Sequence, residues 1–509
     1  MSRVVVLGAG LSGLTAACHL AGRGHDVVVV EREGQPGGRA GRLCRDGYSF
    51  DTGPTVLTMP GLLAEAFAAA GTPMDELLTL RRLDPAYRAC FADGSTIHVR
   101  HGREAMAEEV RVTCGPDEAV AFERFVDWLT RLYHLEMQPF IARNFDSPLD
   151  LGMPPGPVLR LLWHGGFGRL GSRVRRTFGD ERLRRLFSFQ AMYAGLPPRE
   201  ALALYAVITY MDTVEGVYFP QGGIFALPRA LAAAAEKAGA QIRYGCAADR
   251  VLLASGTTGP VRGVRLADGA TIPTDEVVCT VDLPVAYSRL LPGLPAPRVV
   301  RRGRYSPSAV VWHVGVRGRP PGPVAHHNIH FGRLWDEAFE ALMRDGTLMP
   351  DPSVLVSVPT LTEPALAPAG GSTLYVLEPV PNLDGRVDWS VERPRMRDRL
   401  GERLAALGYP ADVVAEEMVD PLDWEAIGME RGTPFALAHT FAQTGPFRPG
   451  NVDDRAPGLV FAGSGTVPGV GVPMVVLSGR LAADRVDEHA AAAGHGARGA
   501  GRGRHGGRE

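Results

Sequence analysis

The chain has no long apolar run and no paired cysteines. Its helical apolar stretch at residues 224–240 is interrupted by polar and charged groups, and no run reaches the about 18 to 20 apolar residues that span a bilayer. No Cys-x-x-Cys pair occurs, so neither a disulfide framework nor a zinc site is supported. The N-terminus begins with a strand rather than with a signal peptide, and we expect a cytoplasmic protein. The six cysteines are Cys18, Cys44, Cys90, Cys114, Cys246 and Cys279.

A strong net charge is also missing. The formal charge of -2 over 509 residues gives no general attraction to nucleic acid, which we do not expect as a partner. His326, His327 and His330 have no carboxylate or cysteine at ligand spacing, so we expect a solvated loop and no metal. Residues 491–509 are rich in glycine and arginine and are expected to be disordered. The length and the 45% hydrophobic content predict two or three domains.

A dinucleotide-binding pattern occupies the first forty residues. An apolar strand at 4–7 runs into Gly8-Ala9-Gly10-Leu11-Ser12-Gly13 and then into a helix rich in small residues. The glycines permit a tight turn, close approach of a pyrophosphate and packing of the helix on the sheet. A second strand ends at Glu31, whose carboxylate suits a free ribose 2′-hydroxyl and therefore FAD or NAD rather than NADP.

The sequence after Glu31 separates these two cofactors. Arg32 is followed by Gly38-Arg39 and then by Gly53-Pro54-Thr55. This extension resembles that of FAD-containing amine oxidases and carotenoid desaturases, in which the glycines and arginine lie along the ribityl and phosphate side of the flavin. The resemblance implies FAD, and it implies that Pro-x-Gly-Gly at 220–223 precedes a helix and a strand, with Val251, that passes the adenine.

A second motif lies near the C-terminus. A buried strand at 458–462 leads to Gly463-Ser464 and then to a helix start that includes Met474 and Val475 and runs to about Val486. The N-terminus of such a helix carries positive partial charge, which stabilises the negative charge of a reduced flavin ring. The two motifs therefore predict one cofactor site built from both ends of the chain.

Residues 463–473 read Gly-x-Gly-Thr-x-Pro-Gly-x-Gly-Val-Pro, and together with the other motifs they resemble bacterial phytoene desaturases over almost the whole chain. Val467 stands where many members have histidine. Ser464 stands where many flavin amine oxidases have an acid, which weakens the amine-oxidase interpretation. Because no cysteine follows Cys279, we expect the FAD to be bound without a covalent link.

The resemblance implies an α/β fold in which a Rossmann-type FAD-binding domain, like those of glutathione reductase and the amine oxidases, is interleaved with an α+β substrate domain. We assign residues 1–85, 215–290 and 446–490 to the first domain. Residues 86–214 and 291–445 form the second, which binds substrate and associates with the membrane.

The implied reaction removes two hydrogens from phytoene, or a similar isoprenoid hydrocarbon, as hydride to the flavin N5 plus a proton. The products would be zeta-carotene, neurosporene or lycopene, and quinone or oxygen would reoxidise the flavin. No catalytic residue is assigned, because the acids Asp146, Asp150 and Asp212 are expected to be solvated surface groups. Membrane contact would be peripheral, on the inner face, through the aromatic and basic segment 157–176, for which a surface helix with its apolar face inward is the alternative.

Three other functions stay open at this point. The first is a flavin amine or porphyrinogen oxidase, and the second is a carotenoid isomerase. The third is a non-catalytic prenyl-lipid carrier of the same fold, which would need no FAD.

Overall fold

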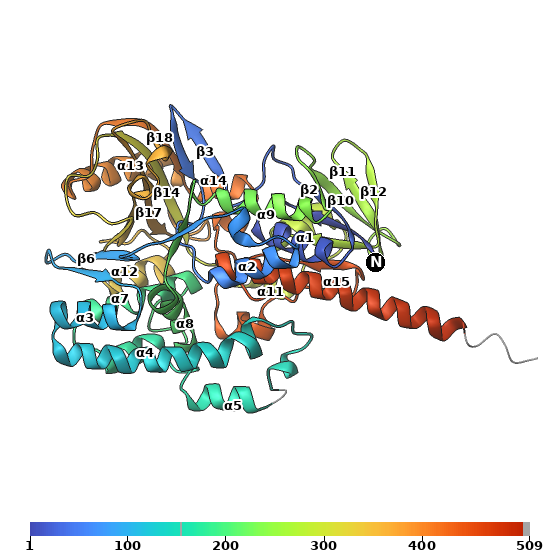
Figure 1. Ribbon diagram of the computed structural model, residues 1–509, viewed down its shortest axis with the longest axis horizontal. Helices are drawn as coiled ribbons and strands as arrows, with labels where there is room; N and C mark the ends of the chain where they lie inside the picture. Colours follow the sequence, from blue (N-terminus) through green and yellow to red (C-terminus); the bar gives the residue numbers. More distant parts are fainter. Residues whose placement is uncertain (153–154, 502–509) are drawn as a thin grey trace, which may run out of the picture.

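A parallel sheet of five strands lies at the centre of one half of the molecule (Figure 1). The computed structural model describes residues 1–152 and 155–501, with side chains as far as residue 492. All neighbouring strands of this sheet run parallel. In spatial order they are β19 (Leu459–Phe461), β13 (Glu276–Cys279), β1 (Arg3–Leu7), β2 (Asp26–Val30) and β9 (Gln241–Arg243).

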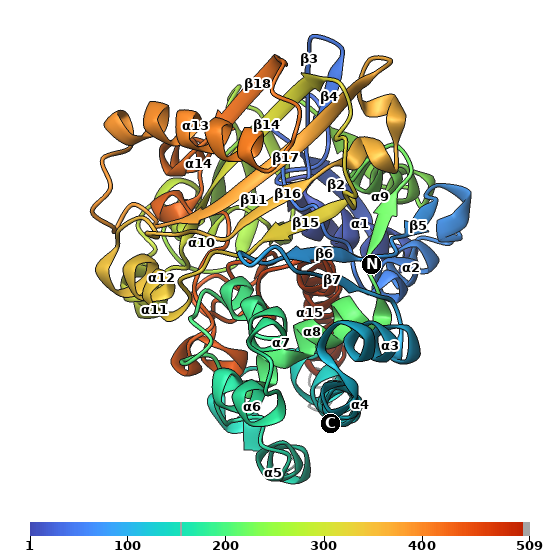
Figure 2. The same cartoon turned by 90° about the vertical axis from the view of Figure 1, so that its left-hand side faces the viewer.

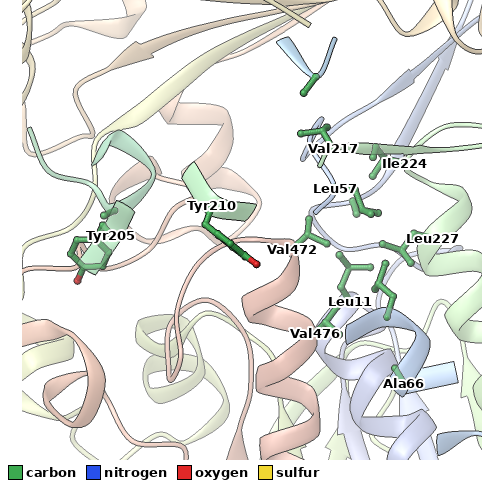
Figure 3. Close-up of a cluster of buried hydrophobic side chains, with 14 of the residues drawn as sticks. Leu11, Leu57, Ala66, Tyr205, Tyr210, Val217, Ile224, Leu227, Val472 and Val476 are labelled. Carbon is green, nitrogen blue, oxygen red and sulfur yellow. The ribbon is translucent and has the colours of Figure 1, made fainter. Parts of the chain in front are cut away.

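Alternate residues of these strands enter two different cores, as the two-residue period of a strand requires. Val4 and Val6 face the helices, whereas Val5 and Leu7 face a three-stranded antiparallel sheet. Figure 3 shows Leu11 beside Val472 and Val476 in the helical core. The helices are α1 (Leu11–Gly22), α2 (Pro60–Ala69), α9 (Ala226–Lys237) and α15 (Val472–Gly501), and the small sheet comprises β10 (Ala248–Leu253), β11 (Val261–Leu266) and β12 (Thr271–Pro273).

A mixed sheet of seven strands forms the centre of the other half (Figure 2). One of its faces packs on α13 (Trp389–Ala406), where Trp312 meets Met396 and Leu400. The opposite face, with Ala309 and Val311, borders a large cavity. The strands in order are β18 (Val413–Val419), β14 (Ser308–Arg317), β17 (Gly371–Val380), β16 (Val354–Ser357), β15 (His327–His330), β6 (Tyr87–Cys90) and β7 (Thr96–Val99).

Helices between residues 103 and 215 lie below the seven-stranded sheet in Figure 2, and three of them line the cavity with Glu136, Leu161, Val207 and Ile208. In both views α5 lies at the lower edge of the molecule (Figures 1 and 2). These helices are α3 (Arg103–Cys114), α4 (Pro116–Glu136), α5 (Pro155–Trp163), α6 (Leu170–Thr177), α7 (Glu181–Leu186) and α8 (Val207–Tyr210).

The remaining elements are short. Two antiparallel ribbons are formed by β3 (Arg42–Arg45) with β4 (Tyr48–Asp51) and by β5 (Leu80–Arg82) with β8 (Tyr218–Pro220). The other helices are α10 (Leu283–Val285), α11 (Arg298–Arg302), α12 (Asp336–Glu340) and α14 (Pro421–Ala426).

The α/β fold expected from the sequence is confirmed, and three local expectations are wrong. The last helix does not end near Val486 but continues to Gly501, because residues 490–493 are alanines, which favour helix. The structure places residues 491–501 in this helix, the disorder of the tail stays a prediction, and residues 502–509 lie outside the described part. The segment 157–176 is not one helix but parts of α5 and α6, joined by a turn.

The third error concerns the histidines, which do not lie in a solvated loop. His327 and His330 belong to β15, and His326 directly precedes it; all three are buried. The ring of His326 contacts the Thr362 hydroxyl, that of His327 contacts the Ser357 hydroxyl, and that of His330 contacts the Tyr409 hydroxyl. Burial lowers the pKa of His327 to about 3 and that of His330 to about 4, so the rings are neutral parts of the sheet.

Candidate functional site

The glycine turn after β1 has the geometry that the sequence predicts. Gly8 has a φ of +104°, and Gly10 precedes α1 without any side chain that caps the helix. The first N–H groups of α1 are therefore free to bind an anion. Gly8, Gly10 and Ser12 line the cavity. Gly13 does not, because it packs against the Gly8 carbonyl and brings the helix onto the turn.

Glu31 is fixed at the cavity wall by two backbone hydrogen bonds. Its carboxylate oxygens accept from the amide of Ala9 at 2.7 Å and from that of Glu33 at 2.9 Å, and the residue is 6% exposed. Both bonds orient the carboxylate beside the glycine turn. Arg32, next to it, also lines the cavity and donates to the Ile427 carbonyl at 3.0 Å.

The segment with Gly38 and Arg39 joins the two ends of the chain. A Cβ on Gly38 would lie 3.2 Å from the Gly10 Cα, so the two glycine segments are in backbone contact. Arg39 donates to the Ser464 hydroxyl at 2.6 Å and lies 3.9 Å from the Asp282 carboxylate. Gly53, Pro54 and Thr55 continue the cavity wall.

The strand that is expected to pass the adenine borders the cavity at its beginning, with Ala248 and Asp249. Val251 lies in β10, is buried in the core between the two sheets and does not line the cavity. The lining is formed instead by residues 246–249, just before it. The strand itself was predicted, but the side of the strand on which the cavity lies was not.

The C-terminal motif forms a loop before α15, and Gly463, Ser464, Met474 and Val475 all line the cavity. The Gly463 amide donates to the Ser478 hydroxyl at 3.0 Å.

Behind this loop lies Arg448, a residue that the sequence analysis missed. It is buried and donates to the carbonyl groups of Ser464 and Thr466. Burial lowers its pKa to about 10, so it remains a cation at neutral pH.

One continuous cavity of about 1220 Å³ connects these loops with the seven-stranded sheet. Ligand sites commonly occupy about 300 to 1,000 Å³, so this space accommodates more than a single small ligand. Beyond the glycine loops the walls are mainly apolar. The residues there include Phe140, Ile141, Leu161, Phe167, Phe189, Met192, Leu204, Val207, Ile208, Met211, Ala309, Val311, Ile329, Phe331, Phe339, Met349, Leu355 and Leu377.

Two buried carboxyl groups interrupt this apolar wall. Asp212 is 4% exposed, and burial raises its pKa to about 7, although Tyr87 opposes the shift. Glu136 is also buried, and burial raises its pKa well above the usual range. The expectation of a solvated surface is thus wrong for Asp212, because the fold turns that part of the chain inward. It holds for Asp146, which pairs with Arg485 while its side chain is 73% exposed.

Asp150 also lies away from the cavity lining, and its carboxylate accepts hydrogen bonds from the backbone amides of Asp146 and Ser147.

A histidine approaches the C-terminal loop from another segment, although Val467 stands where many proteins with this motif have a histidine. The ring of His439 lies against Gly469 and contacts the Thr444 hydroxyl at 3.2 Å. No local sequence pattern identifies His439 as part of the site, because it approaches Gly469 from thirty residues earlier in the chain.

A family model of flavin-containing amine oxidoreductases matches residues 11–487, so the chain belongs to this family. It is 52% identical over 495 residues to the phytoene dehydrogenase of Streptomyces griseus, and the alignment covers 96% of this chain and 95% of that protein. A zeta-carotene-forming phytoene desaturase of Myxococcus xanthus is 38% identical, with 95% and 93% covered. Within the family, the chain therefore belongs to the phytoene dehydrogenases and desaturases and is an FAD-dependent oxidoreductase.

The solved structure of cyclohexylamine oxidase from Brevibacterium oxydans shares the fold, with a TM-score of 0.59 and 17% identity. The alignment covers 96% of this chain and 99% of that one. Among residues 1–152 and 155–501, no helix combines the length and apolar character that crossing a bilayer requires.

Proposed function

We propose that this protein desaturates phytoene, using FAD held between the two ends of the chain. The observation that carries the proposal is the single cavity in which a dinucleotide cradle opens into an apolar chamber. The relatives' names supply the substrate class. A hydrocarbon has no polar group to grip, so burial of its surface, worth about 25 cal/mol per Å², must supply the affinity.

The residues at the cradle fit non-covalent FAD. The glycine turn leaves free amides for the pyrophosphate, Glu31 presents an oriented carboxylate for the ribose, and Arg39 and the 463–475 loop border the space for the ring. When bound, the flavin accepts two electrons and one hydrogen from carbon. The chain's own part is to bind and orient the hydrocarbon, to exclude water and to take up the remaining proton. The proposed contacts are Gly8, Gly10, Ser12, Glu31, Arg32, Gly38, Arg39, Gly53, Pro54, Thr55, Gly463, Ser464, Met474 and Val475. Gly13 contributes by bringing the helix onto the glycine turn.

We also propose that the protein reaches its substrate at the inner face of the membrane through α5. Leu159, Leu162 and Trp163 are 60%, 58% and 93% exposed on this helix, and nearby arginines suit anionic lipid. Leu161 of the same helix lines the cavity. Phe441 is exposed and also lines the cavity, and its ring centroid lies 6.3 Å from that of Phe167. Apolar surface therefore continues from the exterior of the protein into the cavity.

The experiment is anaerobic mixing of the FAD-loaded protein with phytoene in liposomes, while flavin bleaching and polyene absorbance are recorded. We expect both changes, followed by reoxidation when quinone or oxygen is added. Chromatography then separates zeta-carotene, neurosporene and lycopene, the products of successive desaturation. Absence of both changes with phytoene refutes the proposal.

The alternatives give distinct results in the same assay. Bleaching by an amine or a porphyrinogen, but not by phytoene, indicates an oxidase of that kind. A shift from cis to trans carotenoid without a new double bond indicates an isomerase. Purified protein that binds no FAD indicates a lipid carrier.

A further inference from the structure

Asp212 lies in the wall of the apolar chamber and has no charged partner among the described residues. It belongs to the helical turn η6 (Met211–Glu215), which continues α8. Its carboxylate oxygen Oδ2 is buried without a hydrogen bond. A carboxyl group in such a place destabilises the fold unless it is protonated, so its presence calls for a role in the chemistry of the chamber.

Two tyrosines flank this carboxyl group. Tyr87 reaches it from β6, and Tyr193 reaches it from η4 (Phe189–Ala194). The Tyr87 hydroxyl lowers the pKa of Asp212, although the hydroxyl and the Asp212 Oδ2 atom form no hydrogen bond. Burial raises the pKa of both phenols far above 10, so neither ionises near neutral pH. In this group of three, Asp212 is the residue that titrates.

The proposed desaturation needs an acceptor for one proton. When bound, FAD would supply the acceptor for one hydrogen and two electrons from a carbon of the substrate. At the neighbouring carbon a C–H bond then breaks, its electron pair becomes the new C=C bond, and its proton must leave. We propose that Asp212 is the base that accepts this proton, its carboxylate becoming a carboxylic acid. This inference rests on the proposed function.

The other titratable groups of the wall are less suited to this step. Glu136 has no neighbour that opposes the effect of burial, which raises its pKa well above the usual range and favours its protonated form. His439 is neutral, but its pKa lies well below 6.5, which makes it a weak base. Asp212, with a pKa of about 7, is substantially ionised at neutral pH and still binds a proton firmly, as a general base requires.

If Asp212 accepts the proton, the rate of flavin bleaching by phytoene should rise with pH around 7, as Asp212 ionises. The groups that face it are Tyr87 and Tyr193. The neighbouring helix α4 carries Tyr133 and Glu136, and His101 packs against Gly216 just past the turn. Because Tyr87 lowers the pKa of Asp212, its removal moves the rise to higher pH.

The test measures the rate of flavin bleaching by phytoene in liposomes, at several pH values, for the holoenzyme and its variants. We expect Asp212→Asn to slow bleaching by roughly 10² to 10⁴-fold and Asp212→Glu to restore part of the rate. Tyr87→Phe should keep a measurable rate whose pH dependence is shifted upward. Glu378→Gln is the matched control, because Glu378 is a buried carboxyl group with a pKa of about 7 that does not line the chamber.

A second readout does not depend on turnover. Infrared titration of the FAD-free protein should show carboxyl absorbance that disappears near pH 7 and comes from both Asp212 and Glu378. Asp212→Asn should lack the Asp212 part and keep the part that Glu378→Gln lacks, and in Tyr87→Phe the Asp212 part should titrate at higher pH. An Asp212→Asn enzyme with wild-type rate and pH profile overturns the inference alone. A wild-type enzyme that phytoene does not bleach overturns the proposed function, and the inference falls with it.

Discussion

Glu31 and Asp212 are both buried carboxyl residues of the same cavity, but their surroundings differ. Glu31 accepts two backbone amides, one at each oxygen. Asp212 has an oxygen with no donor and is surrounded by apolar and phenolic groups. Hydrogen bonds hold the first in one orientation, which suits binding, whereas the second is free to gain and lose a proton, which suits chemistry.

Replacement of Glu31 by glutamine should weaken FAD binding. The amide nitrogen of glutamine would face a backbone N–H, so one buried donor loses its acceptor. Hydrogen bonds to charged groups contribute about 1.5 to 3 kcal/mol, which corresponds to a roughly 10- to 100-fold higher Kd. Titration of the FAD-free protein with FAD measures this. Glu236→Gln, an exposed site outside the cavity, is the control, and equal affinities of the three proteins would contradict the assigned role.

Asp212→Asn should change how the stability of the FAD-free protein depends on pH. The unfolding free energy of the variant, minus that of the wild type, should be larger at high pH than at low pH. The folded pKa of about 7 lies above the ordinary 3.8, so the wild type loses stability as pH rises from about 4 to about 7. The variant has no such loss. We expect the difference in unfolding free energy to grow by up to roughly 4 kcal/mol between these limits. Urea unfolding across this range measures it, and a difference that does not vary with pH would contradict the burial of an ionisable Asp212.

Residues within one local motif were predictable, and residues that meet from distant segments were not. Gly8, Glu31 and Arg39 belong to patterns whose spacing alone specifies their position. Arg448 and Asp212 carry no such pattern, because their environment is set by the way separate helices and sheets pack around the cavity. The side chain of Val251 lies in the core rather than in the cavity wall, because a strand has two faces and the sequence does not say which one borders the cavity.

At the level of elements, the site depends on the close contact of α1 with α15. Gly479 of α15 lies against the backbone of α1, where an added Cβ would collide with the Ser12 carbonyl and lie 2.9 Å from the Thr15 Cβ. Since Ser12 belongs to the glycine turn, the packing of the last helix fixes the position of the first. Small residues at this crossing are therefore part of the cofactor cradle.

Gly479→Ala should destabilise the protein by about 1 to 3 kcal/mol, because overpacking pushes the two helices apart. It should also weaken FAD binding. Thermal unfolding of the FAD-free protein and FAD titration measure the two effects. Gly61→Ala in α2 is the control, because nothing lies within 4 Å of its added Cβ, and alanine there should stabilise the helix by up to about 1 kcal/mol. A Gly479→Ala protein as stable as the Gly61→Ala protein would contradict the tight crossing.

The exposed face of α5 should bind lipid. Combined replacement of Leu159, Leu162 and Trp163 by serine should reduce flotation with anionic liposomes at least tenfold, because each large side chain contributes up to about 1.5 to 3 kcal/mol when buried. Stability should hardly change, since these side chains are exposed already. The control replaces Val391 of α13 and Leu407 directly after it, both exposed, and α13 lies at a distance from α5 (Figure 1). Equal flotation of all three proteins would show that α5 is an ordinary surface helix.

The sequence predicted elements best where the hydrophobic pattern is simple. The β1, β2 and β19 strands are largely continuous apolar runs. The seven-stranded sheet was seen only in part, because β15 contains two histidines and looks polar. The strand can be buried because its imidazoles are neutral and contact hydroxyl groups. These contacts join residues that are distant in the sequence, so the sequence pattern does not reveal them.

At the level of the whole molecule, chain segments far apart in sequence share each sheet. The strands of the parallel sheet come from residues 3–30, 241–279 and 459–461, all within the segments we assigned to the FAD-binding domain. The strands of the seven-stranded sheet come from residues 87–99 and 308–419, within the other assignment. The chain crosses between the halves several times, so we propose that the two domains fold and unfold together.

Saturating FAD should therefore shift one unfolding transition of the whole protein rather than one of two. At a free concentration a thousand times the Kd, binding adds about 4.1 kcal/mol to the folded state. Calorimetry with and without FAD, read together with tryptophan fluorescence, measures the shift, because Trp312, Trp389 and Trp424 lie in or against the seven-stranded sheet, away from the glycine turn. Gly8→Val is the control that should not respond, since a φ of +104° excludes a β-branched residue there. If FAD moves a first transition while tryptophan reports a second, unmoved one, the halves are independent, and the crossings of the chain do not couple them.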